Sequence, residues 1–203
     1  MAKVDFKKQL KHLYRPSAKA VSVVDVPQMN FLMIDGQGDP NTSLEYQEAM
    51  AALYTISYQL KFTIKQLDPE LDYVVPPVEG LWWAEDMEAF SLGDKDAWQW
   101  TAMILAPDQV TRDLFDEAVA ELQRKKDLPG LPRLRLEGYH EGLSVQIMHL
   151  GPYAEEAPTI EKLHAFARDQ GYRLRGKHHE VYLSDPRRTA PDKMKTVIRQ
   201  PVE

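Results

Sequence analysis

The chain has 203 residues, the length of one domain or of two small ones, and 43% of them are hydrophobic, enough for a sizeable core. Its 25 basic and 31 acidic residues give a net charge of -6, which opposes nonspecific binding to nucleic acid. The absence of cysteine excludes disulfides, thiolate nucleophiles and zinc–thiolate sites and fits a cytoplasmic location, and without a long apolar run we expect neither a secretory leader nor a membrane span.

Residues 1–20 are predicted to form a helical extension. Basic side chains surround Phe6, Leu10 and Leu13, a spacing that predicts a short amphipathic helix. Such terminal helices are usually solvated surface elements, so we expect this one to dock weakly on the body of the protein. Binding to an anionic surface is the less favoured alternative.

Residues 21–105 are predicted to form a first strand–helix–strand–strand unit. In chain order, the expected elements are strands at 21–26 and 31–34, a helix from about 46 to 67, and strands at 73–83 and 97–105. The first two strands, separated at Pro27, form either one bent strand or two. Asp68 and Pro69 end the helix, and a turn at 92–94 should pair the last two strands.

Residues 134–203 are predicted to repeat this order as a second unit, after a linking helix and loop over 106–133. The expected elements are a linking helix at 110–122, strands at 134–140 and 143–150, a helix from Pro158 to Gly171, and strands at 177–184 and 195–202. Glu141 and Gly142, between two strands, are a strong signal for a β-hairpin.

Two pairs of residues align the units. Gly36 and Gly151 each end an apolar strand before a helix, and Glu79 and Glu180 each precede aromatic and aliphatic strand residues. The predicted fold class is therefore α+β. Duplicated strand–helix–strand–strand units of the SHS2 type would share an antiparallel sheet, carry helices on one face and form a central ligand cleft. We expect residues 1–203 to be a single domain.

Three segments carry a resemblance to a known family. They are His149-Leu150-Gly151-Pro152-Tyr153, Glu180-Val181-Tyr182-Leu183-Ser184-Asp185-Pro186-Arg187 and Lys195-Thr196-Val197-Ile198-Arg199-Gln200-Pro201-Val202. With Thr159 in the helix between them, the pattern resembles the GyrI-like small-molecule-binding domain, whose fold is the duplicated unit. Segments 30–40 and 77–83 resemble a stand-alone branch of that family, which includes cyclopropanoid hydrolases that open the strained ring of DNA-alkylating natural products.

The resemblance implies that the chain binds flat hydrophobic or aromatic small molecules in its cleft and hydrolyses strained electrophilic ones, a detoxification role. Glu180 would activate the water that opens a cyclopropanoid ring, and Tyr139 or another tyrosine would be the donor to the developing enolate or phenolate. The other expected ligand contacts are Trp82, Trp83, Trp100, Tyr182, His149, Glu79 and Tyr73. A non-catalytic module that binds or sequesters drugs and a gyrase-inhibitor-like interaction protein are the alternatives.

No cofactor, metal or direct contact with nucleic acid is expected. Residues 1–20 are too short for a helix-turn-helix. His178 and His179 are adjacent on a strand, so their side chains diverge, which disfavours a metal site. Burial among aromatic rings should raise the pKa of Glu180, although an ion pair with Arg173 or Arg175 is the structural alternative.

Several of these residues also have a structural interpretation. Trp82 and Trp83 are adjacent on a strand and face opposite ways, so at most one of them lines a given cleft. Glu155 and Glu156 precede a helix, where acidic residues complement the helix dipole. The alternative for these two glutamates is a second acidic group at the cleft.

Overall fold

The structure, a computed structural model, describes residues 3–85 and 95–203. Its helices are α1 (Phe6–Gln9), α2 (Lys11–Tyr14), α3 (Leu44–Leu67), α4 (Arg112–Lys125) and α5 (Ala157–Asp169). Its strands are β1 (Ser22–Val26), β2 (Met29–Gln37), β3 (Val78–Trp83), β4 (Gln99–Leu105), β5 (Arg135–Tyr139), β6 (Gly142–Leu150), β7 (His178–Tyr182) and β8 (Lys195–Pro201). The turn predicted at 92–94 lies outside the described residues.

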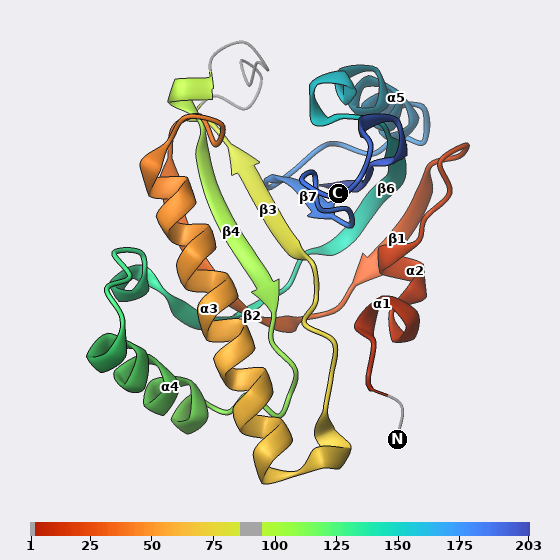
Figure 1. The fold of residues 1–203 in the computed structure, drawn as a ribbon. Coiled ribbons are helices and arrows are strands. Elements are labelled where there is room, and N and C mark those ends of the chain that lie inside the picture. The colour runs from red at the N-terminus through yellow and green to blue at the C-terminus, as the bar shows by residue number, and fades with distance from the viewer. Residues whose placement is uncertain (1–2, 86–94) are drawn as a thin grey trace.

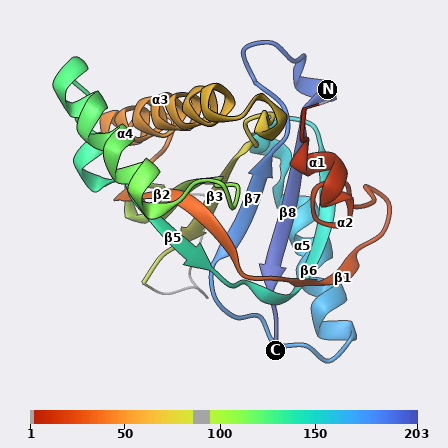
Figure 2. The ribbon, with the colours of Figure 1, turned by 90° about the horizontal axis from the view of Figure 1, so that it is seen from below.

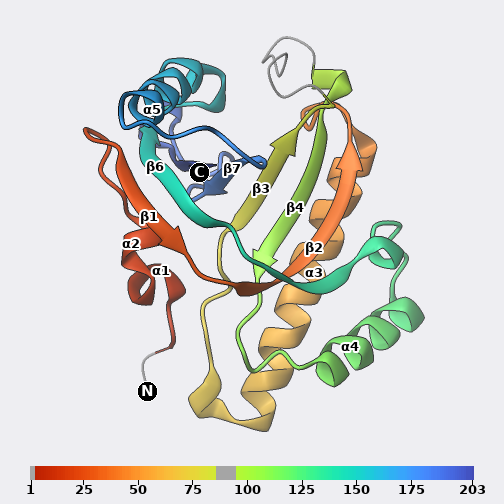
Figure 3. The ribbon, with the colours of Figure 1, turned by 180° about the vertical axis from the view of Figure 1, so that it is seen from behind.

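The described strands form one antiparallel sheet in the order β1-β6-β8-β7-β3-β4-β2-β5, and the sheet is strongly curled (Figure 1, Figure 3). Helices α3 and α5 pack on one face, which we name the α3/α5 face. Helices α1 and α2 lie on the other face beside β6 and β8, and we name this the N-terminal face (Figure 2). The predicted α+β class is confirmed.

The strand order shows the duplication. The first half, β2–α3–β3–β4, and the second half, β6–α5–β7–β8, follow the same sequence of elements. In each half the last strand lies between the other two, and the halves meet where β3 pairs with β7. Only residues 79–82 and 178–181 form this central pairing. The predicted strand–helix–strand–strand repeat is therefore confirmed.

The predicted hairpin at residues 134–150 is wrong. Strand β5 pairs with β2, and β6 pairs with β1. The links 27–28 and 140–141 therefore each cross between opposite ends of the sheet. Because two linking residues span only about 10 Å, the sheet must curl until its ends approach each other. The segments at 21–26 and 31–34, predicted as one bent strand or two, form two strands, because β1 and β2 pair with different partners.

Helix α3 supplies much of the core of the first half. Ser43 caps it by accepting a hydrogen bond from the backbone N–H of Tyr46 at 3.2 Å, and it ends just before Pro69. Its buried hydrophobic residues recur at helical spacing and pack on β2, β4 and α4: Ala49, Ala52, Leu53, Ile56, Leu60 and Ile64. Within the described residues, no helix combines the length and the apolar character that crossing a bilayer requires.

The N-terminal segment docks more firmly than its sequence predicts. It forms two short helices rather than one, and Leu13 and Tyr14 at the end of α2 are 0% and 2% exposed. These side chains pack against Val181 of β7 and Val197 of β8. The prediction of a weakly docked helix is therefore wrong, because the segment completes the core of the N-terminal face.

The register of β3 and β7 decides which side chains meet. Glu180 stands opposite Gly80, and both lie on the α3/α5 face. Glu79 stands opposite Val181 and lies with His179 on the N-terminal face. The alignment of Glu79 with Glu180 is thus one residue out of register. Because strand side chains alternate, that single residue separates the two carboxylates by the thickness of the sheet.

Candidate functional site

Acidic and aromatic side chains gather on the α3/α5 face where β3 and β7 meet. We name this group the carboxylate–aromatic cluster, and its members are Tyr46 of α3, Trp82 of β3, Tyr153 and Glu156 just before α5, and His178, Glu180 and Tyr182 of β7. Solvent reaches the cluster, since 38% of Tyr153 and 14% of the Glu180 side chain are exposed. Both halves of the chain contribute to it.

A hydrogen bond joins β3 to β7 beside Glu180. The indole N–H of Trp82 donates to the hydroxyl oxygen of Tyr182 at 2.9 Å, and that hydroxyl lies close enough to Glu180 to lower the pKa of its carboxyl group. Gly80 makes room for the Trp82–Tyr182 pair, because a Cβ atom there would stand 2.6 Å from Trp82 Nε1 and 3.0 Å from the Tyr182 hydroxyl oxygen. The glycine opposite Glu180 is therefore part of the site.

Glu180 is paired with a histidine rather than with an arginine. His178 Nε2 lies 3.1 Å from Glu180 Oε1, which requires a proton on Nε2. Arg173 pairs with Glu203, and Arg175 donates to two backbone carbonyls. The ion pair between Glu180 and one of these arginines, the structural alternative for this residue, is absent from residues 3–85 and 95–203. The same residues contain no group of three potential metal ligands.

The carboxyl groups of Glu156 and Glu180 lie near each other, and each shifts the pKa of the other. Burial, followed by the charge of Glu180, raises the pKa of Glu156 to about 9. Burial also raises the pKa of Glu180, but the hydrogen bond from His178, its charge and the nearby Tyr182 hydroxyl outweigh this, so the pKa falls below its ordinary value. At neutral pH Glu156 is protonated and Glu180 is ionised. The raised pKa that was expected for Glu180 is found for Glu156 instead.

Two buried oxygens beside this pair have no well-aligned hydrogen-bond partner within the described part of the chain. They are Glu156 Oε1 and Thr196 Oγ1. The Thr196 hydroxyl nevertheless faces Glu156, because it lowers the pKa of that carboxyl. Buried polar atoms of this kind are usually satisfied by an ordered water or by a ligand. The surroundings of the carboxyl pair therefore suit a bound water molecule.

Three tyrosine hydroxyls around the pair remain protonated. Burial and the charges of Glu156 and Glu180 raise the pKa of Tyr153 to about 12. Burial, followed by the charge of Glu180, also raises the pKa of Tyr46 and of Tyr182. All three hydroxyls can therefore act as hydrogen-bond donors at any physiological pH.

Aromatic rings form the wall of the cluster behind Tyr46. The ring centroid of Tyr46 lies 6.0 Å from that of Trp82 and 5.0 Å from that of Trp100, and Trp82 lies 5.6 Å from Trp98. Trp100 is fully buried and passes over Gly36, where a Cβ atom would stand 2.3 Å from the ring. Trp100 therefore supports the wall from behind.

His149 holds the turn that presents the second carboxyl group. Its Nδ1 lies 2.9 Å from the Thr159 hydroxyl oxygen, and its Nε2 lies 3.3 Å from the Pro152 carbonyl oxygen. These contacts join the end of β6 to α5 and fix the intervening turn. They explain why the His-Leu-Gly-Pro-Tyr segment and Thr159 occur together, because the turn between them carries Tyr153 and Glu156.

Four residues predicted to form the site lie away from Glu180. Trp83, Glu79 and Tyr139 are on the N-terminal face, where Tyr139 packs against the aromatic ring of Phe31. Tyr73 packs beside Lys61, which lies 15 residues beyond Tyr46 on α3, or about 22 Å along a helix. The structure therefore does not bring Tyr139 to the carboxylate that it was expected to assist.

Sequence reasoning missed Tyr46 and Tyr153 and gave Glu156 only as an alternative. A signal for Tyr153 was present, because it ends the Gly-Pro-Tyr segment that carries the family resemblance. Tyr46 follows the cap of α3 closely, which places it at the end of the helix nearest the junction of the halves. No local pattern indicates that α3 and α5 bring these residues together.

The fold and the cluster define a small-molecule-binding module built from two related halves. The family model for the GyrI-like small molecule binding domain matches residues 19–203, and the chain belongs to this family. No curated protein matches the chain at a significant level.

Three solved structures from Listeria innocua resemble the chain over nearly its whole length. One, an uncharacterised conserved protein, is 44% identical with a TM-score of 0.91, and the match covers 99% of this chain and all of that one. Two described as hydrolases are 43% and 41% identical, with TM-scores of 0.88 and 0.86. These matches cover 100% and 99% of this chain and 100% of each relative.

Proposed function

We propose that the protein binds flat hydrophobic or aromatic small molecules at the carboxylate–aromatic cluster, between α3 and α5, and hydrolyses strained electrophilic ones. The proposed reaction is the opening of a cyclopropanoid ring by water, and the proposed role is detoxification. The two Listeria relatives described as hydrolases support this class of reaction. The observation that carries the proposal is the placement of two carboxyl groups, Glu180 and Glu156, among aromatic rings, with pKa values shifted in opposite directions.

Glu180 is the general base. Its carboxylate takes a proton from a water molecule while the water oxygen forms a bond to a carbon of the cyclopropane ring. One ring C–C bond breaks, and its electron pair passes to the conjugated carbonyl oxygen of the ligand, which becomes a phenolate or enolate. The lowered pKa of Glu180 makes it a modest base, and positioning of the water and release of ring strain reduce the demand on it.

Glu156 is the acid. Its carboxyl group, protonated at neutral pH, donates a proton to the phenolate or enolate oxygen as charge develops there, directly or through the Tyr153 hydroxyl. After the reaction Glu180 is protonated and Glu156 is ionised. Transfer of the proton from Glu180 back to Glu156 restores the starting state, so the net change is addition of one water to the ligand. Glu156 takes the role first expected of Tyr139.

The aromatic rings supply affinity for a flat ligand. Tyr46 and Tyr153 come from different halves, and their partly exposed rings stand near the carboxyl pair. Stacking on such rings favours planar polycyclic molecules, and exclusion of bulk water strengthens the polar contacts that the carboxyl pair makes.

Incubation with a cyclopropanoid alkylator followed by mass spectrometry tests the proposal. The wild-type protein should give a product heavier by one water molecule. Glu180→Gln keeps the shape of the side chain but removes the base, so hydrolysis should slow by roughly 10²- to 10⁴-fold while binding persists. The matched control is Glu155→Gln, at an exposed glutamate next to Glu156, which should leave the rate unchanged.

The same experiment separates catalysis from sequestration. If wild-type protein and Glu180→Gln both bind the alkylator and leave it intact, hydrolysis is rejected and a drug-sequestering module remains. The Tyr182 hydroxyl near Glu180 favours catalysis, because a module that only binds needs no proton donor beside its carboxylate.

A further inference from the structure

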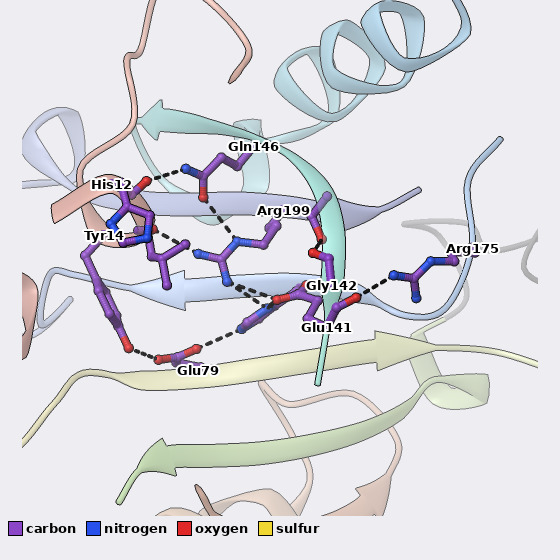
Figure 4. Close-up of polar contacts among 11 residues, drawn as sticks. His12, Tyr14, Glu79, Glu141, Gly142, Gln146, Arg175 and Arg199 are labelled. Atoms are coloured by element: carbon purple, nitrogen blue, oxygen red, sulfur yellow. Dashed lines mark hydrogen bonds and ion pairs between the residues drawn. The ribbon is translucent and has the colours of Figure 1, made fainter. Parts of the chain in front are cut away.

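A second buried polar cluster lies on the N-terminal face, behind the same pair of central strands (Figure 4). We name it the junction cluster, and its members are Tyr14 of α2, Glu79 of β3, Glu141 in the link before β6, His179 of β7 and Arg199 of β8. Each of these residues is at most 2% exposed. None of them takes part in the proposed reaction.

An imidazolium group joins the two halves inside this cluster. His179 Nε2 lies 2.9 Å from Glu79 Oε2, and His179 Nδ1 lies 3.0 Å from both carboxylate oxygens of Glu141. Both ring nitrogens face carboxylates, so both carry protons. Arg199 Nη1 donates to Glu141 at 3.0 Å, which balances the two negative charges with two positive ones. Glu79 belongs to the first half, and its partner His179 belongs to the second.

Helix α2 also binds both halves. The Tyr14 hydroxyl donates to Glu79 Oε1 of the first half at 2.6 Å. The backbone carbonyls of the two preceding residues accept hydrogen bonds from Arg199 Nη2 and Gln146 Nε2 of the second half, at 2.9 and 2.6 Å. Figure 4 shows Tyr14 and Arg199 approaching the cluster from separate elements.

The ends of the N-terminal segment repeat this arrangement. The Val4 N–H donates to the Asp72 carbonyl at 3.0 Å, and the Val4 carbonyl accepts from the Val74 N–H at 2.8 Å, just before β3 of the first half. The Ser17 carbonyl accepts from the Met148 N–H at 3.0 Å, on β6 of the second half. Residues 4–17 are therefore hydrogen-bonded to the first half at one end and to the second half at the other.

We propose that residues 4–17 and the junction cluster form a clasp that sets the spacing of the two halves, and that Tyr14 is thereby a positioning residue for the ligand site between α3 and α5. The inference rests on the proposed location of that site. Apart from the links at 27–28 and 140–141, the halves meet in the sheet through four residue pairs of β3 and β7, and paired strands vary readily in twist. Fastening the halves on the N-terminal face fixes the angle at which α3 and α5 stand on the other face.

The matches to other proteins agree with a device added to a shared domain. The family match begins at residue 19, beyond the clasp segment. The Listeria relatives, in contrast, align over 99–100% of the chain and therefore along most or all of this segment. The clasp would then belong to this branch of the family.

Distance measurement between two spin labels tests the clasp without any ligand. Because the chain has no cysteine, Ala51→Cys on α3 and Glu161→Cys on α5, both exposed, provide unique attachment sites. Double electron–electron resonance should give a narrow distance distribution for this pair. Adding Tyr14→Phe, which removes the hydroxyl and keeps the ring, should shift or broaden the distribution beyond the width of the original peak. Tyr172→Phe, under α5 and outside the clasp, is the matched control and should not change it.

A second variant keeps the test decisive if the buried change prevents folding. Val4→Pro removes the N–H that donates to Asp72 at the surface end of the clasp, and it should also broaden the distribution. The clasp is rejected if Tyr14→Phe and Val4→Pro lower the melting temperature but leave the distance unchanged, or if Tyr172→Phe broadens it equally. Because no turnover is measured, failure of hydrolysis would not affect this result, and an unchanged distance with intact hydrolysis would reject the clasp alone.

Discussion

Each face of β7 carries a buried cluster that contains carboxyl groups, a histidine and tyrosine. The two clusters differ in whether their charges are balanced. On the N-terminal face, Glu79 and Glu141 meet His179 and Arg199, so two negative charges face two positive ones. On the α3/α5 face, two carboxyl groups meet each other and one histidine. Among the described residues, no lysine or arginine donates a hydrogen bond to that second pair.

This difference separates structure from chemistry. In the balanced cluster, the pKa of Glu141 falls to about 2 because the charges of His179 and Arg199 outweigh its burial, so the carboxylate stays ionised. In the unbalanced pair, burial and the charge of Glu180 raise the pKa of Glu156 more than the charge of Lys95 lowers it, so one of the two carboxyl groups stays protonated near neutral pH. Carboxyl groups held in different protonation states are the arrangement that acid–base catalysis needs.

Breaking the balance of the junction cluster should have the largest effect on stability. Arg199→Met removes a buried cation and leaves Glu141 with one partner fewer, which should lower the free energy of unfolding by about 3–5 kcal/mol. Urea denaturation at pH 7 measures the change. Glu180→Gln removes one of two neighbouring carboxyl groups and leaves no buried charge without a partner. It should therefore lower the free energy of unfolding by less than about 1 kcal/mol in the same measurement. Equal losses in the two variants would contradict the comparison.

Replacing Glu156 with glutamine, which needs no proton, should stabilise the protein at alkaline pH. The pKa of Glu156 is raised from 4.5 to about 9 by folding, so its contribution is fully present below pH 4.5 and is lost as the pH rises to 9. Glu156→Gln needs no proton and can still donate to Glu180. The variant should therefore exceed wild type by about 2–3 kcal/mol at pH 8, and by progressively less toward pH 4.5.

The pH profile of Glu156→Gln also isolates the junction cluster. Folding raises the pKa of His179 to about 9, because the charge of Glu141 and hydrogen bonds to carboxylates outweigh its burial. Its stabilisation is present below pH 6.5 and is lost as the pH rises through 9. This loss should persist in the variant. If the difference in free energy of unfolding between the variant and wild type does not change with pH, Glu156 does not carry the proton proposed for it.

The sequence predicted those features that depend on local patterns. The helical period of α3, its end at Pro69 and the glycines at positions 36 and 151 were enough to predict two related units. Glu180 was likewise identified from its own strand. The same approach failed at residues 134–150. There β5 pairs with β2 and β6 pairs with β1, and these contacts join residues that are far apart in the sequence.

The candidate site was predicted less well because faces depend on register. Aligning Glu79 with Glu180 placed two carboxylates in one cleft, whereas a shift of one residue puts them on opposite faces. Tyr139 was assigned to the site for a related reason, since its face is set by the pairing of β5 with β2. The pairing of Glu156 with Glu180 depends on where α5 packs, which no local pattern specifies.

Filling the space opposite Glu180 should have a moderate effect. The added methyl group of Gly80→Ala would collide with Trp82 and Tyr182, lowering stability by roughly 1–2 kcal/mol and breaking their hydrogen bond. Thermal unfolding measures the first effect, and tryptophan fluorescence reports the second. Gly138→Ala is the matched control, because its methyl group would meet the flexible end of Gln28. Equal fluorescence changes in the two variants would remove Gly80 from the site.

The smallest effect on ligand affinity is expected at Trp83, which lies one residue from Trp82 but on the other face. The Lys177 ammonium group stands 3.3 Å from the centre of the Trp83 ring, so Trp83→Leu should lower stability by about 0.5–1 kcal/mol through the lost cation–π contact. Affinity for a cyclopropanoid alkylator should stay within about twofold, less than 0.5 kcal/mol. Trp82→Leu should weaken binding far more, because it removes both a wall of the carboxylate–aromatic cluster and the donor to Tyr182. A larger loss of affinity at Trp83 than at Trp82 would place the ligand on the N-terminal face and reverse the comparison.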